Sequence, residues 1–231
     1  MIDIQQQEEM FIAIGNILPK RLQVYAIGGT ALMLRGIKNA TLDVDFIFDK
    51  KEDRKEFIEA LKKLGAKESD VTLVYGLKDN TPLMLEFNNC RFDMFMNKII
   101  TSTFSDAMKE RAKQIHEFGN LIIRVADPDD VLIMKSVTSR EKDLDDIVSI
   151  INKSHIDWEI IVEESREQVK LGNEIAIMSL GEKLEKLANR KLIVVPKDAS
   201  DRIWKLFNKQ VKDNKQIKSG AKKKKYSKKH K

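Results

Sequence analysis

The sequence predicts an α+β fold: a mixed β-sheet flanked by helices, followed by a helical C-terminal region and a disordered basic tail. In the first half of the chain, short apolar segments rich in β-branched residues alternate with helical patterns. From Asp127 onward the apolar period is almost wholly helical, and residues 218–231 contain eight Lys and no acid. We therefore expect an α+β core at 1–126, a helical region at 127–215 that packs on the core, and a tail at 216–231.

Five elements are expected before Gly65. Apolar residues three or four apart predict the helices, and short apolar runs predict buried strands. Pro19 ends the first helix and Gly65 the last one. The elements are a helix at 4–18, a strand at 22–27, a short helix at 31–35, a strand at 43–48 and a charged helix at 50–64.

The chain then continues with strands and finally with helices. Strands are expected at 71–75, 83–87, 90–96 and 120–126, with a helix at 104–117 before the last of them. Asn88 and Asn89 join two of these strands as a tight hairpin, because asparagine tolerates the left-handed backbone that such turns need. Further helices are expected at 129–138, 141–152, 156–171, 173–189 and 199–212.

Composition and charge exclude several classes of protein. Apolar residues make up 42% of the chain and charged residues 34%, which excludes disorder of the whole chain. The single cysteine, Cys90, excludes an internal disulfide and a cysteine zinc site. The sequence has no apolar run near the roughly 20 residues of a membrane span, and its first residues are acidic and polar. A cytoplasmic protein with no membrane partner is the expectation.

A candidate anion-binding turn lies between the strand at 22–27 and the helix at 31–35. Gly28 and Gly29 let the backbone bend sharply and approach a ligand closely. Free N–H groups at the start of the helix favour phosphate, and Thr30 can cap the helix and offer a hydroxyl. The alternative is a tight strand-to-helix turn without a ligand.

Three acids form a candidate metal site. Asp43 and Asp45 lie two residues apart on one strand, so their side chains share a face, roughly 7 Å apart. They repel each other unless a cation lies between them, and Mg²⁺ prefers sparse carboxylate ligation. Asp93, within the strand at 90–96, is a third such acid. The alternatives are a charged strand edge for the first two acids and an ion pair with Arg91 for Asp93.

Together these motifs resemble the nucleotidyltransferase superfamily to which DNA polymerase β belongs. More narrowly, they are similar to small microbial nucleotidyltransferases of the AbiEii toxin type. The matching residues are Gly28-Gly29-Thr30-Ala31-Leu32, Arg35-Gly36, Thr41-x-Asp43-x-Asp45 and Asp93.

A second stretch resembles the same family, so that the resemblance covers about residues 22–150. Lys135, Arg140, Lys142-Asp143 and Asp146 match a helix-loop-helix pattern that lies beside the nucleotide in that family. The alternative is ordinary salt bridging between two helices.

The resemblance implies a Mg²⁺-dependent nucleotidyltransferase with a two-metal site that Mn²⁺ can also fill. Such an enzyme transfers a nucleotide from an NTP, such as ATP, to an acceptor and releases pyrophosphate. The implied catalytic residues and metal ligands are Asp43, Asp45 and Asp93, and the implied nucleotide-binding residues are Gly28, Gly29, Thr30, Lys135, Arg140 and Asp143. A toxin with a cognate antitoxin partner is also implied. The alternative is a non-catalytic protein of this fold that binds RNA or protein.

The basic tail has two interpretations. Without residues 218–231, the chain has 34 Lys and Arg against 36 Asp and Glu, so the positive net charge resides in the tail. The tail is either a disordered solubilising end or an electrostatic arm that recruits tRNA or another RNA through its phosphates.

Overall fold

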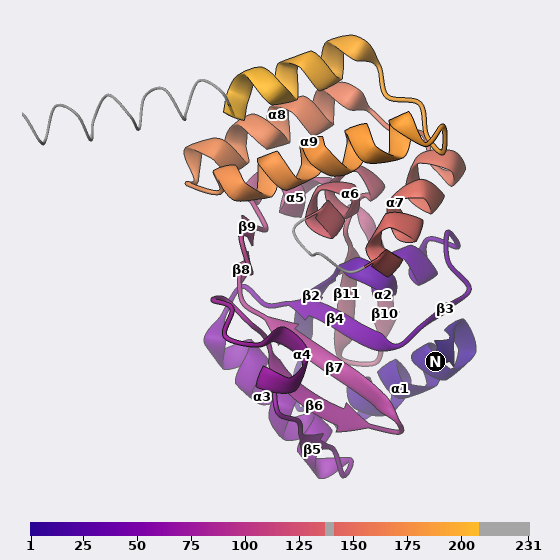
Figure 1. The fold of residues 1–231 in the computed structure, drawn as a ribbon. Helices are drawn as coiled ribbons and strands as arrows, with labels where there is room; N and C mark the ends of the chain where they lie inside the picture. The colour runs from indigo at the N-terminus through magenta and orange to yellow at the C-terminus, as the bar shows by residue number, and fades with distance from the viewer. Residues whose placement is uncertain (137–140, 208–231) are drawn as a thin grey trace, which may run out of the picture.

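A seven-stranded mixed sheet runs through the first half of the chain (Figure 1). The computed structural model describes residues 1–136 and 141–207. Parallel pairing joins β2 (Leu22–Ala26) to β11 (Leu121–Val125) and β4 (Asp43–Ile47) to β7 (Cys90–Phe95), and the other neighbours are antiparallel. The predicted α+β fold is therefore confirmed. In order across the sheet, the strands are β10 (Gln114–Phe118), β11 (Leu121–Val125), β2 (Leu22–Ala26), β4 (Asp43–Ile47), β7 (Cys90–Phe95), β6 (Leu83–Phe87) and β5 (Lys67–Glu68).

Two helices pack on one face of this sheet, α1 (Ile4–Ile17) and α3 (Lys51–Lys63). Their aromatic rings meet the central strand: Phe46 of β4 lies 5.4 Å from Phe11 and 5.6 Å from Phe57, measured between ring centroids. All three rings are fully buried. Since side chains alternate along a strand, this packing fixes which residues of β4 point to the opposite face.

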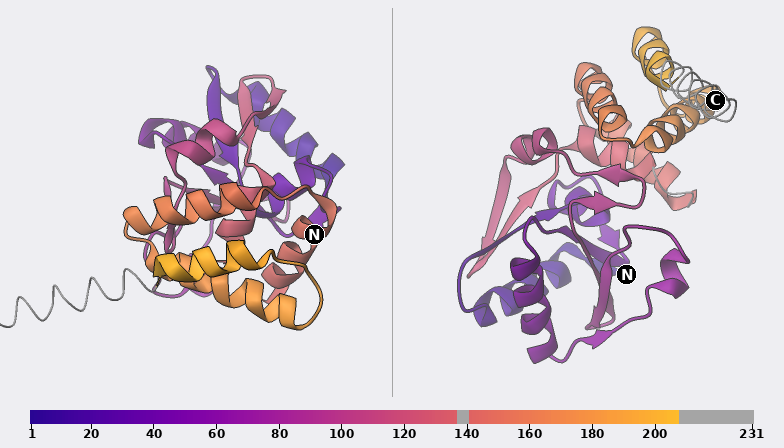
Figure 2. Two further views of the ribbon diagram at one scale, coloured as in Figure 1. Left: turned by 90° about the horizontal axis from the view of Figure 1, so that it is seen from above. Right: turned by 90° about the vertical axis from the view of Figure 1, so that its left-hand side faces the viewer.

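The opposite face carries α2 (Gly28–Leu34), which contacts β4 and α6 (Pro128–Ser136). Around α6 pack α7 (Glu141–Lys153), α8 (Trp158–Lys170) and α9 (Glu174–Asn189). A last helix is described from 197 to 207, so the end of the helix expected at 199–212 lies outside the described residues. Figure 2 shows these helices as a layer at one end of the molecule, beside the half that holds the sheet. The predicted helical region is confirmed.

Two-residue strands complete the fold. β1 (Ile2–Asp3) pairs with β3 (Ala40–Thr41), and β8 (Lys98–Ile99) pairs with β9 (Ser102–Thr103). Within the described part of the chain, no helix has the length and apolar character needed to cross a bilayer.

The prediction of a strand at 71–75 is wrong, because the structure has a one-turn helix there, α4 (Thr72–Tyr75). The Asp70 carboxylate accepts hydrogen bonds from the backbone N–H and the hydroxyl of Thr72, which starts the turn. Leu73 is 85% exposed, so the apolar run that predicted a buried strand lies largely at the surface.

The single helix expected at 104–117 is also wrong. The structure has a short helix, α5 (Asp106–Arg111), and then β10, which forms a hairpin with β11. The hairpin loop is Gly119-Asn120, and Gly119 has a φ of 58°, the left-handed conformation that favours glycine. The Gly119-Asn120 pair is the sequence signal for this hairpin, because such a pair is typical of a two-residue hairpin loop.

Candidate functional site

The structure brings the three predicted acids to one face of the sheet. Asp45 of β4 lies opposite Asp93 of β7 in a parallel pair, and Asp43 lies opposite Arg91. All four side chains therefore project to the face opposite the Phe46 core. Asp93 is fully buried, Asp43 is nearly so, and Asp45 is half-buried.

Arg91 bridges two of these acids. Its Nε lies 2.6 Å from Oδ1 of Asp93, and its Nη2 lies 2.9 Å from Oδ2 of Asp93 and 2.5 Å from Oδ2 of Asp43. Burial raises the pKa of Asp93, and the hydrogen bonds from Arg91 offset only part of this effect. The ion pair considered as an alternative for Asp93 is thus present, and it includes Asp43 as well.

Tyr75 is a site residue that the sequence analysis missed. Its hydroxyl donates a hydrogen bond of 2.6 Å to Oδ2 of Asp93, and its ring packs edge-on against Phe95 at 6.1 Å. Burial raises the pKa of the Tyr75 phenol, and the charge of Asp45 adds to the effect. The sequence pattern at 71–75 predicted a strand and therefore did not indicate Tyr75 as a site residue. No short-range pattern in the sequence predicts the hydrogen bond between Tyr75 and Asp93.

Gly28 fits closely against Asp45. Its φ is 55°, and a Cβ built there would collide with the carboxylate of Asp45. The same turn forms two hydrogen bonds with the backbone of β4 at Asp45. Thr30 Oγ1 accepts a hydrogen bond from the backbone N–H of Asp45 at 2.9 Å, and the N–H of Ile27 donates to the Asp45 carbonyl at 3.1 Å. Gly28 and its turn therefore set the position of one acid directly.

Thr30 does not cap the helix, contrary to expectation. The helix begins at Gly28, and Ile27 occupies the cap position without a side-chain cap. The fully buried hydroxyl of Thr30 bonds to the strand instead. Beside it, a Cβ on Gly29 would collide with the hydroxyl of Thr41, so this glycine permits close packing between helix and strand.

Lys135 enters the site from α6. Its Nζ lies 2.9 Å from Asp143 and 2.7 Å from Asp146, both on α7, and Lys38 also pairs with Asp146 at 2.7 Å. Burial lowers the pKa of Lys135, but Asp143 and Asp146 raise it by more, and Asp45 contributes in the same direction. Salt bridging between the two helices is therefore present. The predicted Arg140 lies outside the described residues.

The three acids have the ligand chemistry that a divalent cation prefers. Asp43, Asp45 and Asp93 supply the hard oxygen ligands that Mg²⁺ prefers, and Gly28 leaves open the space beside Asp45 that a Cβ would fill. In the described residues, however, no three His, Cys, Asp or Glu side chains gather closely enough to hold a metal ion. Between two of the three acids lies the guanidinium of Arg91, which contacts both Asp43 and Asp93.

A family model described as "Nucleotidyltransferase of unknown function (DUF6036)" matches residues 9–192. The chain belongs to this nucleotidyltransferase family. The match runs from α1 to beyond α9 and includes every acid of the site. The predicted superfamily is confirmed, and the narrower similarity to AbiEii-type proteins stays a prediction. No curated protein matches the chain.

Two solved nucleotidyltransferase structures are similar to the chain. ANT(2")-Ia in complex with adenylyl-2"-tobramycin has a TM-score of 0.45 and 14% identity, over 78% of this chain and 98% of its own. An antigenic nucleotidyltransferase-like protein from Paracoccidioides brasiliensis has a TM-score of 0.44 and 13% identity, over 86% of this chain and 98% of its own.

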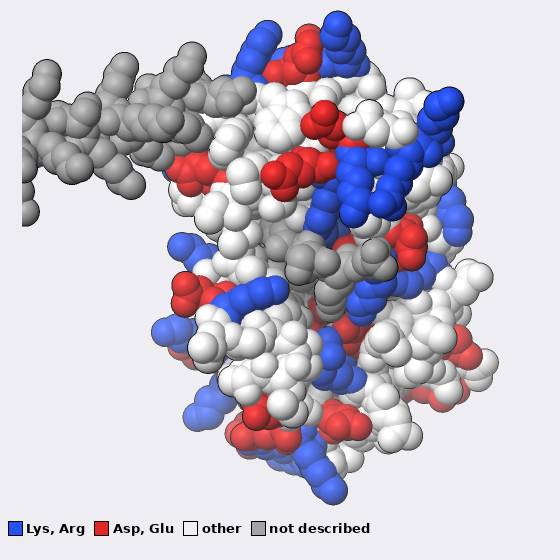
Figure 3. All heavy atoms as spheres, in the orientation of Figure 1, with Lys and Arg blue, Asp and Glu red and all other residues white. Residues whose placement is uncertain are grey.

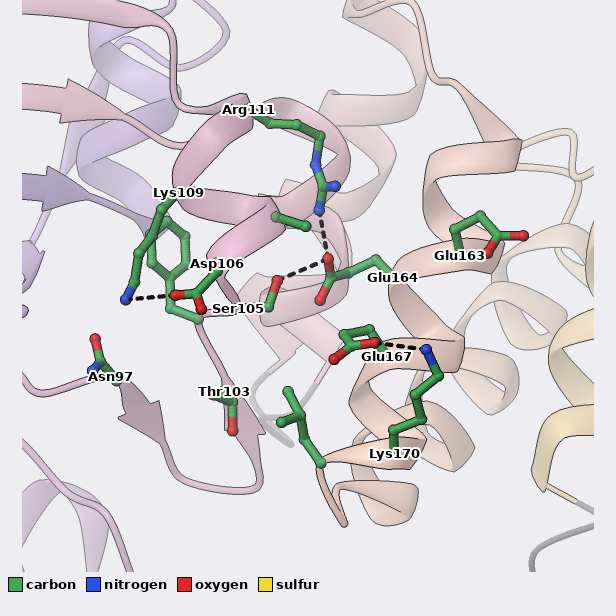
Figure 4. Close-up of a pocket in the computed structure, with 13 residues that line it drawn as sticks. Asn97, Thr103, Ser105, Asp106, Lys109, Arg111, Glu163, Glu164, Glu167 and Lys170 are labelled. Atoms are coloured by element: carbon green, nitrogen blue, oxygen red, sulfur yellow. Dashed lines mark hydrogen bonds and ion pairs between the residues drawn. The ribbon is translucent and has the colours of Figure 1, made fainter.

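A cavity of about 420 Å³ lies apart from the acids of this nucleotidyltransferase fold, between α5 and α8 (Figure 4). Its three bases are already paired: Lys109 with Asp49 at 2.8 Å, Arg111 with Glu164 at 2.6 Å and Lys170 with Glu167 at 3.0 Å. A triphosphate would have to break these pairs. Each of these three bases is therefore already neutralised by an acid.

Proposed function

We propose that the chain is a Mg²⁺-dependent enzyme that transfers a nucleotide from an NTP to an acceptor hydroxyl and releases pyrophosphate. One observation carries the proposal: Asp43, Asp45 and Asp93 share one face of adjacent parallel strands, with Gly28 in contact with Asp45. Membership of a nucleotidyltransferase family supports nucleotide transfer in general.

The acids have distinct proposed roles. Asp43, Asp45 and Asp93 would hold Mg²⁺ or Mn²⁺, which when bound polarises the phosphoryl oxygens and favours deprotonation of the attacking hydroxyl. Asp93 is the proposed acceptor of that proton. Burial raises the pKa of Asp93, which makes its carboxylate a stronger base toward that proton.

The nucleotide would lie between the sheet and α6. The backbone N–H groups of Gly28 and Gly29 would face the β- and γ-phosphates, where the lack of side chains permits close approach. Thr30 would act indirectly, because its hydroxyl accepts a hydrogen bond from the backbone N–H of Asp45 and so helps to position that acid. Lys135 and Arg140 would supply positive charge to the phosphates, and Asp143 would keep Lys135 in place through their ion pair.

RNA, such as tRNA, is the proposed acceptor. Basic side chains gather over α9 on the face shown in Figure 3. Lys183 and Lys186 lie three residues apart on α9, and Arg190 is the residue that caps its C-terminus. Lys183 donates to the carbonyls of Lys135 and Ser136, which supports a position of this ridge beside the proposed site. The Lys-rich tail would extend the phosphate contacts. A toxin restrained by an antitoxin protein is the corresponding proposed biological role.

The decisive experiment compares NTP turnover by the wild-type protein with that of Asp43→Asn and Asp45→Asn. Each radiolabelled NTP is incubated with Mg²⁺ and total RNA, and pyrophosphate and labelled RNA or protein are measured. We expect both variants to fold and to lose turnover, because each lacks a metal ligand. Asp201→Asn, which changes an exposed acid on the helix at 197–207, is the matched control and should stay active.

Two outcomes would contradict the proposal. Near-wild-type turnover in either variant would exclude the assigned metal ligands. If instead the wild-type protein binds NTP or RNA but releases no pyrophosphate with any NTP, the alternative of a non-catalytic binding protein is favoured.

A further inference from the structure

Arg91 is a permanent cation inside the candidate metal site. It lies two residues before Asp93 on β7, on the same face, and opposite Asp43 in the strand register. Three of its hydrogen bonds end on oxygens of these two acids. Its side chain is 23% exposed, so it lies at the border between the buried acids and the solvent.

A divalent ion at Asp43 and Asp93 needs oxygens that Arg91 already uses. Arginine does not lose its proton in proteins, so its charge remains when the ion arrives. Two cations then share the same carboxylates and repel each other. Tyr75 also bonds to Asp93, but as a neutral donor, so it adds no charge repulsion.

We propose that Arg91 is a positioning residue that neutralises Asp43 and Asp93 in the metal-free protein and competes with the divalent ion for them. The ion then binds well only together with a nucleotide, whose phosphates offer negative charge to both cations. This inference rests on the proposed function, since it assumes the metal site at these acids. It adds that Arg91 makes metal and nucleotide bind cooperatively. Lys142 is a second cation near these acids, but its Nζ lies 3.9 Å from Asp43 and its side chain is more exposed than that of Arg91, so we assign the competition to Arg91.

The test is a Mn²⁺ titration of the nucleotide-free full-length protein, followed by calorimetry or by electron paramagnetic resonance. We expect weak binding by the wild type and at least tenfold tighter binding by Arg91→Gln, which removes the charge. Arg91→Lys keeps the charge and should stay within a few-fold of wild type. Tyr75→Phe is the matched control: it removes a neutral hydrogen bond to Asp93 and should also stay close to wild type.

A second readout is thermal. In EDTA, Arg91→Gln should melt below wild type, because Asp43 and Asp93 lose their counter-charge. Added Mn²⁺ should raise the melting temperature of Arg91→Gln by more than that of the wild type, since a ligand stabilises in proportion to its binding. If Arg91→Gln is unfolded without metal, Mn²⁺ should refold it, as followed by circular dichroism. Failure of Mn²⁺ to refold it would overturn the proposal.

The possible failures can be told apart. Equal Mn²⁺ affinity of the wild type and Arg91→Gln, with binding lost in Asp45→Asn, overturns the competition and leaves the metal site intact. Mn²⁺ binding to no variant, or binding that survives Asp45→Asn, overturns the proposed function and the competition with it.

Discussion

At the scale of single residues, Gly28 is the most sensitive position of the site. Both Gly28 and Gly36 have a positive φ, of 55° and 70° respectively. A Cβ on Gly36 would meet nothing within 4 Å, whereas a Cβ on Gly28 would collide with the Asp45 carboxylate. The two glycines therefore separate backbone strain from damage to the site.

We expect Gly36→Ala to cost about 1–2 kcal/mol of stability, the usual penalty for a left-handed non-glycine residue, and to leave turnover unchanged. Gly28→Ala should cost more and should also abolish metal-dependent NTP turnover, because the new methyl group displaces Asp45. Urea unfolding and the turnover assay on both variants provide the measurement. Equal stability loss with retained turnover in Gly28→Ala would show that the turn does not shape the site.

At the scale of elements, α6 connects the site to the helical half. From Asp129 to Ser136 every residue is buried, so the helix has no solvent-facing side. In its first turn, the Asp130 carboxylate forms an ion pair with Arg111 of α5, with 2.6 Å between Nη2 and Oδ1. The same Nη2 atom lies 2.6 Å from Oε2 of Glu164 on α8. Lys135, at the other end, faces the candidate site. The ion pairs at the first turn therefore help to set the position of α6, and with it the position of Lys135.

The first turn of α6 also makes stability depend on pH. Burial, followed by the nearby charge of Asp127, raises the pKa of Asp129 to about 7. An unfolded chain releases this proton near pH 4, so between pH 4 and 7 the folded state holds a proton that the unfolded state has lost. The free energy of unfolding should therefore fall as the pH rises through this range and level off above it.

We expect Asp129→Asn to stabilise the protein by roughly 2–4 kcal/mol at pH 8 and to have little effect near pH 4, at about 1.4 kcal/mol per pKa unit. Urea unfolding at several pH values measures this difference. Asp106→Asn is the control, because the Asp106 side chain is 95% exposed and pairs with Lys109 at the surface. A stability difference for Asp129→Asn that does not change with pH would contradict the prediction.

At the scale of the whole molecule, charge is distributed very unevenly. The 14 residues 218–231 carry eight Lys, while the rest of the chain has slightly more acids than bases. An acidic body holds RNA poorly on its own, since the backbone phosphates repel it. For the proposed RNA acceptor, the basic ridge on α9 and the Lys-rich tail would offset this repulsion.

Deletion of residues 218–231 should therefore raise the KM for an RNA acceptor. The slope of log affinity against log salt should fall in magnitude by about 0.7–0.9 for each phosphate contact that is lost. The NTP affinity should not change, because the phosphate turn and the three acids lie elsewhere in the chain. Transfer by full-length and truncated protein is measured across a series of salt concentrations. Parallel curves for the two proteins would show that the tail only solubilises the chain.

The sequence by itself determined the local elements that build the site. Alternation within 43–48 placed Asp43 and Asp45 on one face and Phe46 on the other, and the structure has this arrangement. The hairpin at Asn88-Asn89 was predictable from turn chemistry. Both asparagines adopt a left-handed backbone, with φ of 50° and 58° respectively. Periodicity and turn chemistry act over a few residues, so they can be read without the fold.

Tertiary structure alone decided which side chains meet. The parallel register of β4 and β7 set Arg91 between Asp43 and Asp93, and only the path of 69–82 brought Tyr75 to Asp93. Thr30 could be taken for a helix cap because its true partner, the backbone of Asp45, lies 15 residues away. Such pairings depend on strand register and on loop paths, which no short-range pattern encodes. Short-range patterns therefore assign the acids of the candidate site to their strands, while the partners of these acids depend on long-range packing.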